Sequence, residues 1–265
     1  MATPELTEVI RYSPFVRRSL KAMLPMGEDG EREALFEKLC AGPWTAEAIQ
    51  AKLTGISDAD ALGLALRKLR REIVVGLVGR NASGRCGYDE VVSVMTSFAE
   101  AAVSTMTSVQ SRLLAARHGV PYGESSGKPQ DLLVVGMGKL GGAELNVSSD
   151  IDLVFLYGED GETRATAEYP QASRFLSNAE FFSRLAKRII PALNEIEGPG
   201  FVFRVDMRLR PNGDAGPIVC SNDMLEEYLY SQGRDWERFA WLKGRIVNEP
   251  VFTDPECFAT QSGEV

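Results

Sequence analysis

The sequence predicts an α+β protein in which a helical N-terminal region precedes a sheet flanked by helices. Apolar residues recur at helical spacing through residues 1–120, whereas short apolar runs typical of buried strands begin only after residue 130. A polar segment rich in glycine, serine and proline, PYGESSGKPQ at 121–130, separates the two patterns and indicates a domain boundary. We therefore expect a helical region over 1–120, a catalytic core over 121–219, and the truncated start of a further helical region over 220–265.

Composition narrows the class of protein. The 265 residues carry a formal net charge of −8, which argues against a nucleic-acid partner. No apolar run approaches the ~20 residues that span a bilayer, and the N-terminal segment with Glu5 and Glu8 is unlike a signal peptide. Four scattered cysteines indicate reduced thiols, so a cytoplasmic protein is expected. Because His118 is the only histidine, any metal must be a hard cation with oxygen ligands.

Two long stripes of apolar residues predict the main helices, over Asp58–Gly79 and over Tyr88–His118. Shorter helices are expected over Glu31–Ala41 and Thr45–Leu53. These stripes indicate packing between helices, and we assign them no chemistry.

The second half of the chain alternates between strand and helix patterns. Buried strands are predicted over 131–135 and 151–157, an amphipathic helix with a kink at Pro191 over 173–196, a strand of alternating polarity over 201–210, and helices over 223–231 and 235–247.

A glycine-rich turn follows the first of these strands. Gly136, Gly138 and Gly141 match the G-x-G-x-x-G pattern of dinucleotide-binding folds. That interpretation requires a crossover helix before the next strand, and the interval from Gly142 to Ile151 is too short to hold one. The two strands are therefore expected to form a hairpin-like pair, with the glycines allowing backbone N–H groups to approach phosphate.

Two aspartates open the second strand. Asp150 and Asp152 are two positions apart, so both carboxylates point to one side of the strand. Such a pair repels itself unless a cation lies between the two groups, and Mg²⁺ suits carboxylates combined with substrate phosphates. A turn with solvated charges is the alternative for an isolated D-x-D. Further phosphate contacts are expected from Lys139, Ser148 and Ser149.

A third carboxylate lies on the polar side of the 201–210 segment. Asp206 stands among Arg204, Arg208 and Arg210. If this segment pairs with the strand of Asp152, Asp206 becomes a further metal ligand or the general base, and Arg208 and Arg210 suit bidentate phosphate binding. A solvated sheet face with ordinary Asp–Arg pairs is the alternative.

Three segments of the chain together resemble a known family. The strings GMGKLGGAELNVSSDIDLVFLY, FVFRVDMRLRPNGDAGPIV and QGRDWERFAWLKGRIV are similar to the bifunctional glutamine synthetase adenylyltransferase/adenylyl-removing enzyme. The resemblance implies a nucleotidyltransferase domain of the DNA polymerase β type, with Mg²⁺ or Mn²⁺ on Asp150, Asp152 and Asp206, and with Gly138 at the turn position. The N-x-S-S-D-I-D version resembles the N-terminal, adenylyl-removing half.

The resemblance also implies partners and a reaction. Glutamine synthetase is the expected substrate protein, ATP, ADP and phosphate are the expected small ligands, and the PII signalling protein is expected to act through the full-length enzyme. The similarity fades after about Pro250, so we expect a truncated chain. Forward adenylyl transfer from ATP and a truncated, non-catalytic regulatory module are the alternatives to removal of AMP by phosphorolysis.

Overall fold

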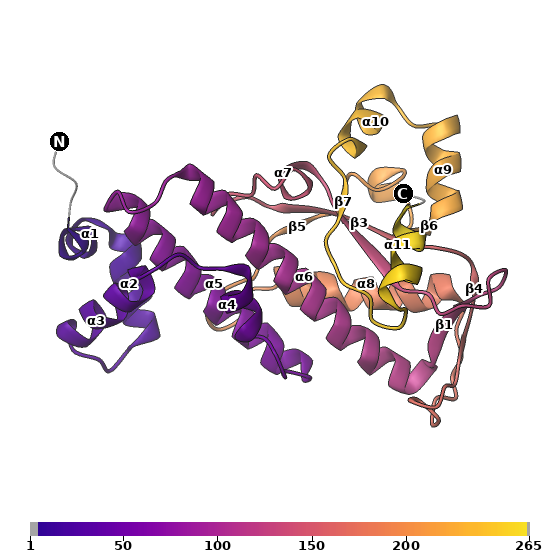
Figure 1. Ribbon diagram of the computed structural model, residues 1–265, viewed down its shortest axis with the longest axis horizontal. Helices are drawn as coiled ribbons and strands as arrows, with labels where there is room; N and C mark the ends of the chain where they lie inside the picture. Colours follow the sequence, from indigo (N-terminus) through magenta and orange to yellow (C-terminus); the bar gives the residue numbers. More distant parts are fainter. Residues whose placement is uncertain (1–4, 264–265) are drawn as a thin grey trace.

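Helices dominate the N-terminal half of the molecule. The computed structural model describes residues 5–263 (Figure 1). Six helices come first: α1 (Leu6–Tyr12), α2 (Pro14–Met23), α3 (Asp29–Cys40), α4 (Ala46–Ala51), α5 (Ala59–Ala82) and α6 (Tyr88–His118). Side-chain oxygens of Ser13, Thr45 and Asp58 accept backbone N–H groups at the starts of α2, α4 and α5, which satisfies donors that a helix leaves free. The structure therefore confirms the predicted helices, within a few residues at their ends.

The C-terminal half contains the strands, with further helices between them. In chain order these are β1 (Val120–Gly123), β2 (Leu132–Gly136), α7 (Gly138–Gly141), β3 (Ile151–Tyr157), β4 (Gly161–Arg164), α8 (Asn178–Asn194), β5 (Val205–Asp206), the 3₁₀ turn η1 (Gly213–Ala215), β6 (Val219–Ser221), α9 (Asn222–Ser231), α10 (Asp235–Trp241), β7 (Arg245–Ile246) and α11 (Pro255–Gly263). The order of helices and strands agrees with the expected α+β class.

The main sheet has the order β5-β3-β2-β7, and β6 also pairs with β3. β2 and β3 are antiparallel neighbours, with Val134 opposite Phe155, as expected for a hairpin-like pair. β5 and β6 run parallel to β3, β5 beside its first residues and β6 beside its last. A separate two-stranded sheet joins β1 to β4.

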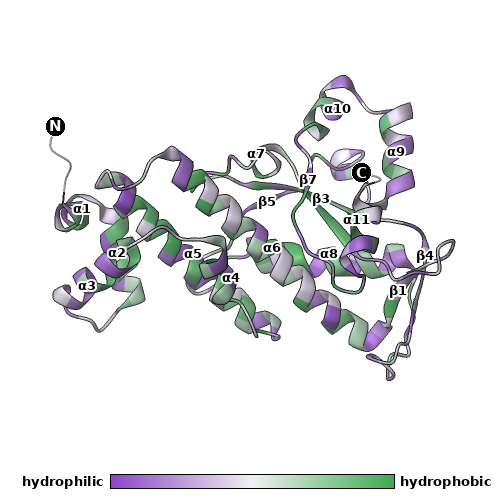
Figure 2. Cartoon of the chain, viewed as in Figure 1, coloured by the Kyte–Doolittle hydropathy of each residue, from purple (hydrophilic) through white to green (hydrophobic). Residues whose placement is uncertain are grey.

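Helices cover both faces of the main sheet. Leu153 and Phe155 belong to a large cluster shared with α5, α6 and α8, whereas Val154 and Leu156 pack with residues of α9 and α11 on the other face. β3 accordingly appears as a mostly hydrophobic strand in Figure 2. The large cluster includes residues from both sides of position 120, so α6 is packed directly onto the sheet-containing half.

Three predictions from the sequence are wrong in extent. The segment 201–210 forms only the two-residue strand β5, because the N–H groups of Val202 and Phe203 both donate to the Leu193 carbonyl at the end of α8 and not to a neighbouring strand. The predicted helix 235–247 ends at Trp241, and Arg245–Ile246 joins β2 as a strand. The polar link 121–130 contains part of β1, which pairs with β4. Within residues 5–263, no helix is long and apolar enough to cross a bilayer.

Candidate active site

The glycine turn is attached to the strand that carries Asp152. The backbone N–H of Met137 donates to the carbonyl oxygen of Asp152 at 2.9 Å, and α7 begins at the next residue. Because β2 and β3 are antiparallel, the turn leaves β2 at the end where β3 begins. The sheet therefore places the glycine turn and the first residues of β3 together.

Gly138 lies directly against the carboxylate of Asp152. Its φ of +53° falls in the left-handed region that favours glycine, and a Cβ added there would stand 2.7 Å from Asp152 Oδ2. Both its conformation and the close approach require glycine at this position. The backbone of the turn thus forms one wall around Asp152.

Asp206 is the neighbour of Asp152 across the sheet. β5 is parallel to β3, and its register pairs Asp152 with Asp206 and Ile151 with Val205. Neighbouring strands are about 4.8 Å apart, and paired residues present their side chains to the same face. The structure therefore brings together these two carboxylates from separate stretches of the chain, as the sequence predicted.

Both flanking aspartates are paired with arginines. Asp150 forms an ion pair with Arg204, whose guanidinium also donates to the Ser148 carbonyl at 3.0 Å. Asp206 forms an ion pair with Arg208 at 2.5 Å, and its Oδ1 accepts the Arg208 backbone N–H at 2.9 Å. Asp152 has no ion pair of its own within the described residues.

The charges at this site are closely coupled. Burial raises the pKa of Asp152, and the nearby charges of Asp206 and Asp150 raise it further, while Arg208 and Lys139 act in the opposite direction. The hydrogen bond and the positive charge of Arg208 lower the pKa of Asp206. Asp152 is consequently the carboxylate whose negative charge is least compensated, which is the condition that a bound cation relieves.

The two serines before Asp150 are organised by Asn146, a residue that the sequence analysis did not assign. Asn146 Oδ1 accepts the Ser148 N–H at 3.1 Å and the hydroxyls of Ser148 and Ser149 at 3.3 and 2.9 Å. The hydroxyls thus hold the turn that leads into Asp150. The spacing of Asn146 two residues before Ser148, just ahead of the strand with Asp152, is the signal that could have identified this role.

Lys139 and Arg210, which were also predicted to contact phosphate, have different surroundings in the structure. Lys139 is exposed on α7, and its charge acts on Asp152. Arg210 is largely buried, since its side chain is 13% exposed and donates to the Met207 carbonyl at 2.8 Å. Arg210 therefore stabilises the turn after Asp206, whereas the Lys139 side chain is exposed to solvent.

Arg70 connects the N-terminal helices to this site, a contact that the sequence analysis also missed. From α5 it donates to the Val147 carbonyl at 3.2 Å, and its guanidinium lies 4.6 Å from the ring centre of Phe201 and 5.8 Å from that of Phe203. One partly buried cation therefore contacts both the turn before Asp150 and the segment before Asp206.

Oxygen donors at the site fit a hard divalent cation. The charges of Asp206 and Asp150 both act on the least compensated carboxylate, Asp152, and carboxylate oxygens are ligands that such cations prefer. Among residues 5–263, however, no three His, Cys, Asp or Glu side chains converge closely enough to hold a metal ion in this conformation. Asp150 and Asp206 are turned towards their arginines instead.

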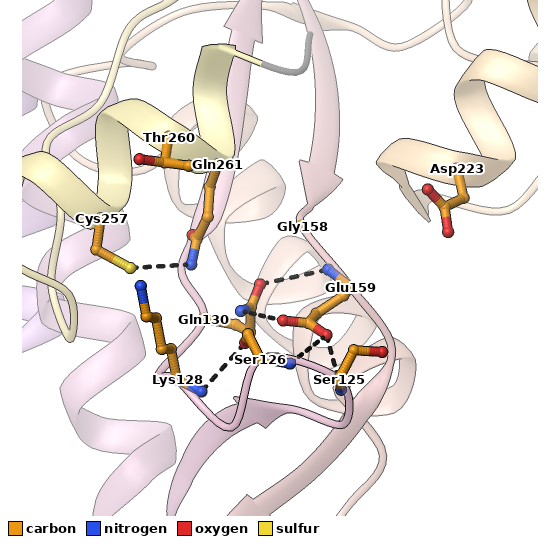
Figure 3. Close-up of a pocket in the computed structure, with 10 residues that line it drawn as sticks. All are labelled: Ser125, Ser126, Lys128, Gln130, Gly158, Glu159, Asp223, Cys257, Thr260 and Gln261. Carbon is orange, nitrogen blue, oxygen red and sulfur yellow. Dashed lines mark hydrogen bonds between the residues drawn. The ribbon is translucent and has the colours of Figure 1, made fainter.

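The cavity shown in Figure 3 is separate from these residues. It has a volume of about 480 Å³ and is lined by the loop between β1 and β2, by Glu159 and by α11. Several of its polar groups are hydrogen-bonded to one another: Glu159 accepts the backbone N–H groups of Ser125 and Ser126 at 2.9 and 3.1 Å, and the Gln130 side-chain amide donates to it at 3.3 Å. None of the predicted site residues lines it.

Comparison with known protein families supports the family resemblance noted from the sequence. Fold and site together define a mixed helix–sheet chain with paired carboxylates beside a glycine turn. The profile of the glutamate-ammonia ligase adenylyltransferase family matches residues 3–254. This chain belongs to that family.

Curated relatives carry the name bifunctional glutamine synthetase adenylyltransferase/adenylyl-removing enzyme. The protein of Ralstonia nicotianae is 48% identical over 247 residues, which cover 91% of this chain and 25% of the relative. That of Bordetella pertussis is 43% identical over 270 residues, covering 98% and 27%. That of Nitrosococcus oceani is 47% identical over 201 residues, covering 76% and 20%. The chain thus spans about a quarter of the length of the relatives it matches.

Proposed function

We propose that the chain carries a metal-dependent nucleotidyltransferase site of the DNA polymerase β type, which removes AMP from adenylylated glutamine synthetase by phosphorolysis. The observation that supports this proposal most directly is the register of β3 and β5, which sets Asp152 beside Asp206 next to a glycine turn. The names of the relatives support glutamine synthetase as the partner.

In the proposed reaction, an oxygen of inorganic phosphate attacks the phosphorus of the AMP–tyrosine ester. The bond from phosphorus to the tyrosine oxygen breaks, and the products are ADP and the free tyrosine side chain. Catalysis of this kind depends mainly on positioning and on electrostatic stabilisation of phosphoryl oxygens. Mg²⁺ or Mn²⁺, held by Asp150, Asp152 and Asp206, would supply charge neutralisation at the transferring group.

Residues of the chain have distinct roles in this proposal. The turn at Gly138 offers backbone N–H groups without side-chain obstruction, and Lys139 adds a positive charge beside Asp152. Ser148 and Ser149 keep the turn before Asp150 in place through Asn146. Arg208 presents a planar guanidinium that matches two phosphate oxygens, while Arg210 holds the following turn.

Forward transfer of AMP from ATP is the second candidate, since the same carboxylates would serve either direction and the relatives' name includes both activities. The direction is tested with two incubations of this chain. One combines adenylylated glutamine synthetase with labelled phosphate and Mg²⁺, and the other combines unmodified glutamine synthetase with ATP labelled in the α-phosphate.

Labelled ADP in the first incubation supports phosphorolysis. Labelled glutamine synthetase in the second supports forward transfer instead. If neither product forms while Mn²⁺ titration detects no bound ion, the chain is a non-catalytic module and the proposal fails. In the full-length protein, regulation through the PII signalling protein belongs to the same proposal.

A further inference from the structure

The two arginines that face the aspartates are held in different ways. Arg204 has two partners, because its guanidinium binds both Asp150 and the Ser148 carbonyl, and its own carbonyl accepts the Ile151 N–H at 2.9 Å. It therefore joins the turn before β3 to the segment before β5, and its role is structural.

The guanidinium of Arg208 is held by one hydrogen-bonding partner, Asp206. Its Nε lies 3.0 and 2.8 Å from the two carboxylate oxygens of Asp206, and a terminal nitrogen lies 2.5 Å from Oδ2. The arginine side chain is 77% exposed, whereas that of Asp206 is only 18% exposed. The guanidinium thus stands in solvent while both carboxylate oxygens are engaged. Because the guanidinium is in solvent in this arrangement, it stays hydrated when it leaves Asp206, and its departure strands no buried cation.

We propose that Arg208 is exchanged between Asp206 and a phosphate group of the substrate, and that a divalent cation binding at the aspartates drives the exchange. This inference rests on the proposed function, because it assigns the cation to Asp152 and Asp206. It goes beyond that function by coupling the binding of the cation to the binding of phosphate.

Competition for the same oxygens is the physical basis. A cation on Asp206 needs the lone pairs that now accept hydrogen bonds from Arg208. Once displaced, the guanidinium retains its positive charge and its paired donors beside the site, where a phosphate can accept both. Without the cation, Arg208 compensates Asp206 and lowers the carboxylate repulsion that acts on Asp152.

Other cations at the site cannot make this exchange. Arg210 is mostly buried and donates to the Met207 carbonyl, and Arg204 is fixed by two partners. Lys139 forms no ion pair within residues 5–263, so no partner would be released. Arg210 also pairs with Asp214 at 3.5 Å, but Asp214 is not one of the proposed metal ligands. Arg208 is therefore the exposed arginine held solely by a carboxylate of the proposed metal site.

Thermodynamic linkage sets the expected behaviour. If the cation frees Arg208 for phosphate, phosphate must strengthen cation binding by the same factor by which the cation strengthens phosphate binding. In the absence of phosphate, by contrast, Arg208 competes with the cation. Removing the guanidinium should therefore tighten the binding of the cation alone and weaken its coupling to phosphate.

The experiment is a titration of the whole chain with Mn²⁺, followed by electron paramagnetic resonance, with and without inorganic phosphate. Binding is corrected for the manganese phosphate complex in solution. Arg208→Gln is compared with Arg184→Gln, which removes an exposed arginine paired with Glu180 at 2.6 Å on α8. We expect Arg208→Gln to bind Mn²⁺ roughly ten-fold more tightly without phosphate, because one positive charge beside a divalent ion is lost. Phosphate should then improve Mn²⁺ binding by a smaller factor than in the wild type.

The outcomes separate this inference from the proposed function. If Arg208→Gln binds Mn²⁺ as tightly as, or more weakly than, the wild type and Arg184→Gln, the exchange is contradicted while the metal site stands. If Arg208→Gln binds more tightly but retains the full effect of phosphate, the guanidinium does not transfer to phosphate and the proposal is again overturned. If the wild type binds no Mn²⁺, the proposed function fails and this inference fails with it.

Discussion

The Cβ position of Gly138 lies 2.7 Å from Oδ2 of Asp152, so the glycine turn and the acidic strand are in direct contact. This contact shows how a turn that matches a dinucleotide-binding pattern packs in a different structural setting. The glycine leaves room for a carboxylate on the next strand of a hairpin-like pair, and no crossover helix intervenes.

Replacing Gly138 by alanine should therefore displace the carboxylate of Asp152. The added methyl group meets Oδ2, and the left-handed backbone costs about 1–2 kcal/mol in a residue that has a Cβ. We expect Gly138→Ala to lose Mn²⁺ binding and to unfold at lower urea concentration, as followed by circular dichroism.

The matched control is Gly127→Ala. Gly127 has a φ of +63°, and nothing lies within 4 Å of its Cβ position. It should show a similar loss of stability and normal Mn²⁺ binding. Equal metal binding by the two variants would show that the contact with Asp152 is unimportant.

Arg70 should matter for stability although it lies on a helix remote in sequence from the acidic residues. Replacing it by methionine removes a hydrogen bond to the Val147 carbonyl and a cation next to Phe201, which together are worth about 1–3 kcal/mol. The free energy of unfolding of Arg70→Met, measured in urea, should fall by that amount. Lys68→Met, at an exposed position of the same helix, should change it by less than about 0.5 kcal/mol. Equal effects of the two substitutions would contradict the role assigned to Arg70.

Asp131 is a buried carboxylate that holds the segment after β7. It accepts the backbone N–H groups of Val251, Phe252 and Thr253 and the hydroxyl of Thr253 at 2.7 Å. Asp131→Ala leaves these donors without their acceptor and should cost about 1–3 kcal/mol or more. Asp131→Asn keeps one acceptor oxygen, so its loss should be smaller.

Burial raises the pKa of Asp131, and the hydrogen bonds from Thr253, Val251 and Phe252 offset only part of that effect. Because the folded-state pKa of Asp131 is above its unfolded value, the contribution of Asp131 to the free energy of unfolding is most favourable below the unfolded pKa. It is lost as pH rises through the folded pKa. Wild-type stability should therefore gain from this group as pH falls towards about 4, and Asp131→Asn should lack that gain. An identical pH dependence in both proteins, measured by urea unfolding from pH 7 to 4, would refute this.

Local patterns in the sequence were sufficient to predict the longest helix and the central strand. The stripe over Tyr88–His118 and the apolar run Ile151–Tyr157 predicted α6 and β3 with the bounds that the structure shows. Both elements are long or strongly apolar, so tertiary contacts reinforce the local preference. The pairing of β2 with β3 followed from the short interval between them.

A local side-chain contact and a long-range strand pairing decided the elements that were mispredicted. After Asp206 the chain turns, because the Asp206 side chain accepts the Arg208 N–H two residues later and ends the strand. Arg245 and Ile246 form a strand because Gly136 and Val135 of β2 offer a free edge. The contact of Arg70 with the Val147 carbonyl and the pairing of Arg204 with Asp150 join residues far apart in the sequence and leave no local signal.

The central claim is that Asp152, with its neighbours, holds a divalent cation, and Asp152→Asn tests it most directly. Burial raises the pKa of Asp152, so the folded state disfavours its ionised form and the neutral amide should leave the metal-free fold intact. Calorimetric titration should show that Mn²⁺ binding falls by at least ten-fold in Asp152→Asn but persists in Asp223→Asn, where the exposed aspartate on α9 is neutralised instead. Wild-type Mn²⁺ affinity in a folded Asp152→Asn protein would contradict the account.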